Sequence, residues 1–90
     1  MANTFQLEIA TPERLITDVQ VTEAQWPAKK GYMGVLPGHA PLVSALGPGV
    51  LTYVGTAGGS RGVVKIDGGF VEVLNDHVRI LADKAEVAQE

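Results

Sequence analysis

Residues 70–82, FVEVLNDHVRILA, contain the pattern that decides the fold of this 90-residue chain. Segments 70–74 and 77–82 are short and rich in Val, Ile and Leu, as expected of half-buried strands. Asn75 and Asp76 stand between the two segments, and this pair favours a tight turn because both residues tolerate a positive φ. The stretch therefore predicts a β-hairpin.

Strand-like segments recur along the rest of the chain, without a convincing helical pattern between them. The 11 Gly and 5 Pro residues supply turns: 56–60 is typical of a hairpin connection, and Gly68-Gly69 is expected to open a strand and mark a bulge. The pattern predicts an all-β fold, an antiparallel sandwich or flattened barrel. The further predicted strands are 4–10 (TFQLEIA), 18–26 (DVQVTEAQW), 50–54 (VLTYV) and 63–66 (VVKI).

The composition excludes several classes of protein. Seven Lys and Arg against ten Asp and Glu give a net charge of −3, which argues against nucleic-acid binding because phosphate recognition needs a basic surface. The chain has no Cys, so a disulfide framework, a thiolate metal site and a Cys nucleophile are excluded. The first ten residues lack the basic and apolar regions of a signal peptide, and we therefore expect a cytosolic setting.

Charge is distributed unevenly, because residues 31–60 contain no Asp, Glu, Lys or Arg. Pro and Gly residues interrupt this segment, so it lacks the run of about 20 apolar residues that a membrane-spanning helix needs. Two interpretations remain open: the segment is core strand plus uncharged turns, or part of it is a surface that a partner covers. Charged residues are depleted at the centre of interfaces because their desolvation is costly.

The sequence predicts no catalytic, cofactor-binding or metal site. His39 and His77 lack the spacing of metal-binding pairs, and His39 lies in a turn that would present its imidazole outward. The glycines at 31, 34 and 38 lack the Gly-Lys-Ser/Thr ending of a phosphate-binding loop. Trp26 is expected in the core. The carboxylates expected on solvated strand faces are Asp67, Glu72, Asp76 and Asp83.

Two segments carry a resemblance to a known family. Residues 31–51, GYMGVLPGHAPLVSALGPGVL, resemble the signature of the epsilon subunit of bacterial and chloroplast F-type ATP synthases. A second match lies at residues 67–73, DGGFVEV, followed by the strand 78–83. The two motifs have the order and spacing of the family, and together they extend the resemblance over nearly the whole chain.

The resemblance implies a noncatalytic subunit of the central stalk, with a ten-stranded β-sandwich that binds the gamma subunit and the c-ring. It implies a role in coupling proton-driven rotation to ATP synthesis, at the cytoplasmic face of the inner or plasma membrane, or at the stromal face of a thylakoid. On this basis residues 1–84 form the sandwich, and 85–90 lead toward a helical domain. No cofactor is implied for residues 1–90, and membrane contact is expected only through the complex.

The resemblance also implies two partner-binding segments. The turn after the first glycines would face the gamma subunit, and the loop before it would approach the c-ring. Family members commonly have an acidic residue in that loop, where this chain has lysines, so a contact of this loop with the c-ring would involve the opposite charge. The implied gamma-binding residues are Pro37, Gly38, His39, Ala40, Pro41 and Leu42, and the implied c-ring residues are Lys29, Lys30, Gly31, Tyr32 and Met33.

A second hypothesis comes from a different functional class. The chain could be a free-standing small β-barrel that binds a ligand, or an enzyme that uses His39 as its acid or base. Such a protein needs a pocket in which polar groups converge. A further expectation concerns the chain without partners, whose uncharged surface would then be exposed and would cause weak self-association.

Overall fold

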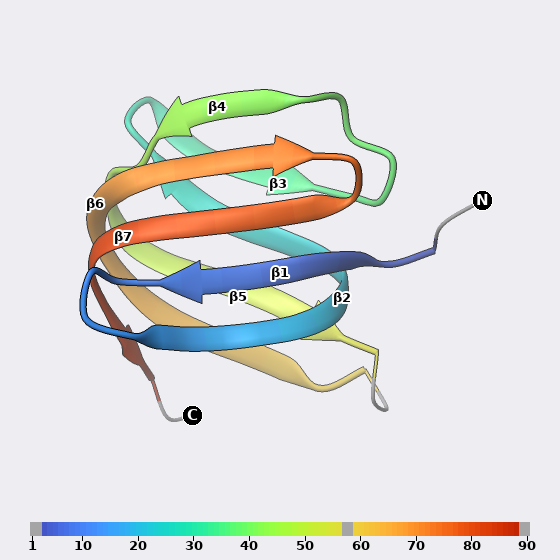
Figure 1. Ribbon diagram of the computed structural model, residues 1–90, viewed down its shortest axis with the longest axis horizontal. Helices are drawn as coiled ribbons and strands as arrows, with labels where there is room; N and C mark the ends of the chain where they lie inside the picture. Colours follow the sequence, from blue (N-terminus) through green and yellow to red (C-terminus); the bar gives the residue numbers. More distant parts are fainter. Residues whose placement is uncertain (1–2, 57–58, 89–90) are drawn as a thin grey trace.

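The computed structural model describes residues 3–56 and 59–88, and this part of the chain is built from strands and turns (Figure 1). It therefore confirms the all-β class that the alternating pattern predicts. The strands are β1 (Phe5–Ala10), β2 (Leu15–Ala28), β3 (Gly31–Val35), β4 (Leu42–Ala45), β5 (Pro48–Gly55), β6 (Arg61–Leu74) and β7 (His77–Val87).

The strands form one sheet that closes on itself. Its hydrogen-bonded order is β1-β7-β6-β5-β2-β3, and β1 also pairs with β2, so five of these strands complete a flattened barrel. β3 and β4 lie outside this ring as edge strands, paired with β2 and β6 respectively. Every pairing is antiparallel except that of β1 with β7. Antiparallel pairing therefore predominates, as predicted, and the exception is this closing pair, where the first and last strands meet.

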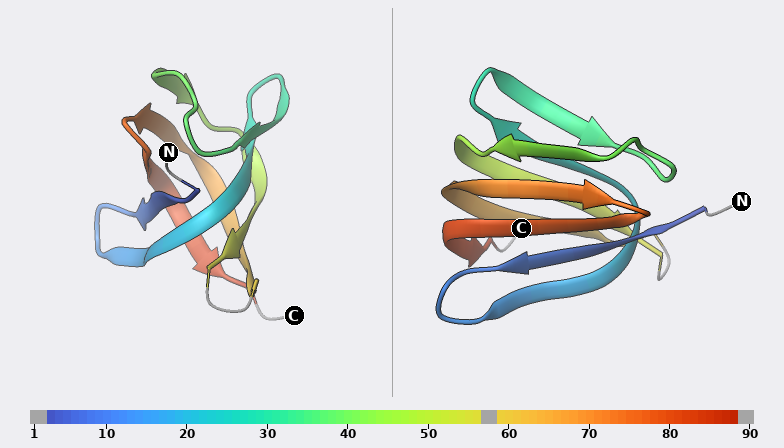
Figure 2. Two further views of the ribbon diagram at one scale, coloured as in Figure 1. Left: turned by 90° about the vertical axis from the view of Figure 1, so that its right-hand side faces the viewer. Right: turned by 45° about the horizontal axis from the view of Figure 1, so that its top comes forward.

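Three long strands cross between the two layers of the flattened barrel. The first half of β2 pairs with β1, whereas its second half pairs with β3 and β5. β6 and β7 turn in the same way, so a front sheet (β4, β6, β7, β1, β2) packs on a back sheet (β3, β2, β5, β6, β7) (Figures 1 and 2). The expected count of ten strands is wrong when each continuous strand is counted once, because β2, β6 and β7 each contribute to both sheets.

Glycines mark one of these crossings. Gly68 and Gly69 have φ values of 75° and 115° and lie inside β6, where the strand bends from the back sheet to the front sheet. The expectation that they open a strand is therefore wrong: residues 63–66 and 70–74 belong to one continuous strand. β7 likewise continues past residue 84, because residues 85–87 pair with 64–66.

The two predicted hairpin turns can be compared with the backbone of the structure. Asn75 and Asp76 have φ values of 50° and 59°, which confirms the tight turn between β6 and β7. The second predicted hairpin connection, at 56–60, includes residues 57–58, which lie outside the described part of the chain. Gly55 N–H donates to the Ser60 carbonyl oxygen at 2.6 Å, so the described ends of this connection are close together.

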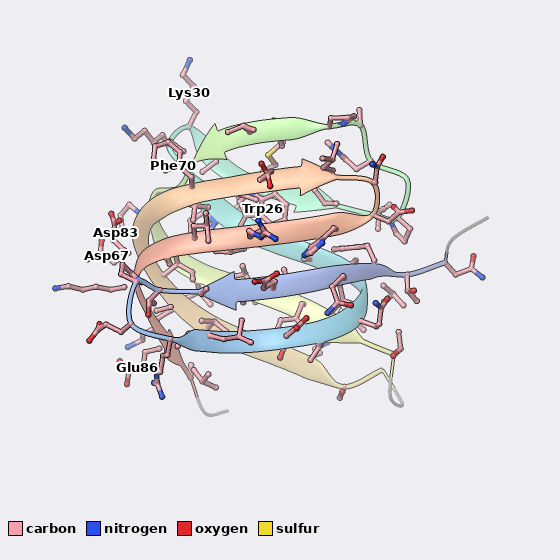
Figure 3. All side chains as sticks on the ribbon, viewed as in Figure 1. Trp26, Lys30, Asp67, Phe70, Asp83 and Glu86 are labelled. Carbon is pink, nitrogen blue, oxygen red and sulfur yellow. The ribbon has the colours of Figure 1, made fainter. Side chains whose placement is uncertain are left out.

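The core lies between the two sheets and consists of inward-facing apolar side chains. Trp26 is fully buried there, as predicted, and Figure 3 shows it between the layers. Side chains alternate along each strand, so β1 buries every second residue from Phe5 to Ile9. The other fully buried large side chains are Leu7, Val21, Leu51, Val64, Val71, Val78 and Ile80.

Candidate partner-binding surface

The uncharged segment is divided between the core and the surface. Strand β5 lies between β6 and β2, so this part of the segment is core strand. Strands β3 and β4 are edge strands, and the loop 36–41 between them is mostly exposed. The interpretation as core strand therefore holds for β5, whereas the interpretation as a surface that a partner covers applies to β3, β4 and the loop 36–41 and stays a prediction.

Residues 37–42, expected from the resemblance to face the gamma subunit, lie in the loop 36–41 and at the first position of β4. This loop is tied to the turn between β6 and β7. Gly38 N–H donates to the Asp76 Oδ1 atom at 2.7 Å. His39 Nδ1 lies 2.7 Å from the Ala40 carbonyl oxygen, which holds the imidazole against its own backbone. Ala40 is exposed, whereas Leu42 packs on the core. An Asp at position 42 would therefore disturb folding as well as any contact.

The residues proposed to approach the c-ring lie at the other end of β3. Lys29 and Lys30 form the exposed turn between β2 and β3. Tyr32 extends across the outer face of the back sheet, and its hydroxyl accepts a hydrogen bond from Val50 N–H at 3.0 Å. Met33 packs on the core. Figure 2 shows this turn and the loop 36–41 at opposite ends of the sandwich, so the two proposed surfaces are separate.

The outer face of the front sheet carries a row of apolar side chains that crosses five strands. The strand register places Ala45 opposite Phe70, Phe70 opposite Leu81, Leu81 opposite Ala10, and Ala10 opposite Leu15. We call these five residues the apolar row. Phe70 is 60% exposed, Leu15 55% and Leu81 50%, although each is large enough to stabilise a core. A groove of 320 Å³ adjoins the row.

A charged row lies beside the apolar row on the same face. Glu72 pairs with Arg79, which lies next to Glu8 on β1. Glu8 Oε1 lies 3.6 Å from Arg79 Nε and 3.1 Å from His77 Nε2. These contacts are partly exposed, so they contribute little to stability. The face thus combines an apolar row with a band of both charge signs, as protein-binding surfaces commonly do.

Sequence reasoning missed Phe70 and Leu81 as surface residues, although alternation contains the signal. Val71 and Val73 face inward, so their neighbour Phe70 must face outward. The same argument places Leu81 outward, between the buried Ile80 and Ala82. Figure 3 shows Phe70 at the same end of the molecule as Lys30.

Further grooves lie elsewhere on the surface. A groove of 510 Å³ between β2, β3 and β5 is lined by Glu23, Gly34 and Arg61, among others, and a groove of 460 Å³ lies over β5, β6 and β7. His39 lines neither of these grooves nor the one beside the apolar row.

Residues 3–56 and 59–88 include no helix long and apolar enough to cross a membrane.

Comparison with known proteins places this sandwich among ATP synthase subunits. Residues 4–88 match the family described as the ATP synthase, Delta/Epsilon chain, beta-sandwich domain. The chain is 58% identical over 90 residues to the ATP synthase epsilon chain of Solibacter usitatus and 44% identical to that of Koribacter versatilis. It matches over its whole length but spans only 66% and 62% of these two relatives.

Solved structures show the same arrangement of strands. A chain of the Euglena gracilis mitochondrial ATP synthase (OSCP/F1/c-ring) superposes with a TM-score of 0.87 and 28% identity, over 97% of this chain and 55% of that chain. A chain of the Tetrahymena thermophila mitochondrial ATP synthase central stalk and c-ring has a TM-score of 0.75 at 16% identity, over 90% of this chain and 64% of that one. The second likeness is one of fold alone.

Proposed function

The chain belongs to the family of the ATP synthase delta/epsilon chain β-sandwich domain, and from this we propose that it is a noncatalytic subunit of the central stalk of an F-type ATP synthase. It binds the gamma subunit and the c-ring, and it helps couple proton-driven rotation to ATP synthesis. It lies at the cytoplasmic face of the inner or plasma membrane, or at the stromal face of a thylakoid. It reaches the membrane only through the complex.

The gamma contact in this proposal is supported by the uncharged surface that the chain exposes. The outer face of the front sheet exposes the apolar row at one end, and the uncharged loop 36–41 lies at the other end. Large apolar side chains that stay exposed across adjacent strands favour a partner that covers them. We therefore assign to gamma the residues Pro37, Gly38, His39, Ala40, Pro41 and Leu42, and we add Phe70 and Leu81.

The contact with the c-ring is assigned to the opposite end of β3. Lys29, Lys30 and Tyr32 are exposed there, while Gly31 makes the turn possible with a φ of 126°. Because this turn carries two lysines, it would meet acidic or neutral groups on the c-ring. Met33, which packs on the core, would support this end from within rather than touch the ring.

Binding to the catalytic head tests the proposal directly. The 90-residue chain would be titrated by calorimetry into purified head that contains gamma, with head lacking gamma as the control. We expect binding only when gamma is present. If the folded chain binds neither preparation, a longer version with the helical domain separates two explanations: binding of that version means that the helices are required, and no binding contradicts the proposed function.

An Ala40→Asp substitution should weaken binding to the gamma-containing head by about tenfold to 100-fold, because it places an unpaired carboxylate in the contact. Ala40 is exposed, so the free energy of unfolding should change by less than about 0.5 kcal/mol. Calorimetric titration measures the affinity, and urea unfolding verifies the fold. Ala40→Ser is the matched control, and we expect it to bind normally. Unchanged affinity of the Asp variant would remove the loop 36–41 from the interface.

A further inference from the structure

The loop 36–41 is held by a side chain from a distant part of the sequence. Gly38 N–H donates to the Asp76 Oδ1 atom, which lies 38 positions further along the chain. Among residues 3–56 and 59–88, this is the hydrogen bond that joins the loop to another element. Residues 36–41 form no strand, and two of them are prolines, which have no N–H to donate. The conformation of the loop therefore depends strongly on the contact with Asp76.

Asp76 is itself fixed by the strands around its turn. Its φ of 59° places it in the tight turn between β6 and β7, whose ends pair Leu74 with His77. Its backbone carbonyl oxygen accepts a hydrogen bond from Gln6 N–H at 2.9 Å, which fastens the turn to β1. The carboxylate therefore extends from a well-anchored part of the sandwich, whereas most of the loop that it binds is exposed.

The residue that donates this hydrogen bond has the greatest backbone freedom. Gly38 has a φ of 84°, a conformation that residues with a Cβ rarely adopt. A glycine without a partner for its N–H samples many other conformations, because it has no side chain to restrict φ. The hydrogen bond from Gly38 to Asp76 thus selects one conformation of a segment that would otherwise vary.

We propose that Asp76 is a positioning residue for the gamma contact: its carboxylate holds the loop 36–41 in the conformation that gamma binds, and it does not touch gamma itself. This inference rests on the proposed function. A partner binds only the fraction of molecules whose loop already has the binding conformation. A loop released from Asp76 populates that conformation less, so the apparent affinity falls by the same factor.

Asp76→Gly tests this role, because glycine keeps the positive φ of the turn and removes the carboxylate. We expect calorimetric titration to show about tenfold weaker binding to the gamma-containing head. Asp76→Asn keeps an oxygen acceptor at the same place and tolerates a positive φ, so it should lose less than about threefold. Asn75→Gly is the matched control: it makes the same kind of change at the neighbouring turn position, and we expect it to bind like the native chain.

Amide hydrogen exchange of the free chain distinguishes the loop from the turn. In the Asp76→Gly variant, exchange at Gly38 should become about tenfold faster, because the acceptor of its N–H is gone. Gln6 should stay protected, because its N–H is bonded to the backbone carbonyl of residue 76 rather than to the side chain. If Asp76 only stabilised the turn, both amides would exchange faster, and that result would contradict the proposal.

Two further results overturn the positioning role while the native chain binds the gamma-containing head. If Asp76→Gly binds as tightly as the native chain, the loop does not need Asp76. If Asp76→Asn loses as much affinity as Asp76→Gly, gamma contacts the charge of the carboxylate directly. Failure of both the native chain and its longer version to bind the head contradicts the proposed function itself, and with it the positioning role.

Discussion

Replacing Gly69 by Ala should lower the free energy of unfolding by about 3–5 kcal/mol, a large loss for a single methyl group. Gly69 has a φ of 115°, a conformation that residues with a Cβ rarely adopt. An added Cβ would lie 2.1 Å from the Leu81 carbonyl oxygen and 2.8 Å from the Ala82 Cα atom. Both are backbone atoms of β7, so the clash is relieved only if β6 and β7 separate where β6 crosses between the sheets.

Two other glycines provide matched controls for this prediction. Gly68→Ala also places a side chain at a positive φ, 75°, but its Cβ would meet the Asp83 side chain, which can move away. We expect a loss of about 1–2 kcal/mol there. At Gly34, which has no positive φ, an added Cβ would make only an ordinary van der Waals contact with the Ala24 carbonyl oxygen at 3.7 Å, so Gly34→Ala should cost less than about 1 kcal/mol. Urea unfolding of the three variants measures the order, and equal losses at Gly68 and Gly69 would contradict the proposed backbone clash.

Much of the fold follows from sequence because local pattern and turn chemistry agree. Alternating apolar residues predicted strands in β1, β2, β6 and β7, and Asn75-Asp76 predicted the turn at its observed place. The pattern could not predict that β6 is continuous. Glycine pairs usually interrupt strands, whereas Gly68 and Gly69 bend β6 without ending it. The two halves of β6 stay in one strand because both pair with β7, and this pairing cannot be read from the sequence pattern.

The surface was harder to predict than the fold. Absence of charge located the segment 31–60, but only the strand pairing separates the central strand β5 from the edge strands β3 and β4. Leu42 and Met33 were expected from the resemblance to contact partners, yet both pack on the core. Phe70 was not identified as a surface residue, because the segment 70–74 alone does not say which of its alternating positions face the core.

A Phe70→Asp substitution should weaken binding to the gamma-containing head by about 100-fold. The change removes the largest side chain of the apolar row and leaves an unpaired carboxylate in a desolvated contact, a combination that costs about 2–4 kcal/mol at the centre of an interface. The fold should tolerate the change, because Phe70 is 60% exposed and its neighbours Val71 and Val73 supply the core contacts. Calorimetric titration of the folded variant measures the loss.

The control for this prediction is Thr52→Asp, which adds the same charge to an exposed position of β5 in the back sheet. General repulsion between the chain and the head would weaken both variants alike, whereas a gamma contact on the front sheet weakens only the Phe70 variant. Phe70→Leu should retain most of the affinity, because it keeps an apolar side chain in the row. If Phe70→Asp and Thr52→Asp bind equally well, gamma does not cover the apolar row, and its contact is confined to the loop 36–41.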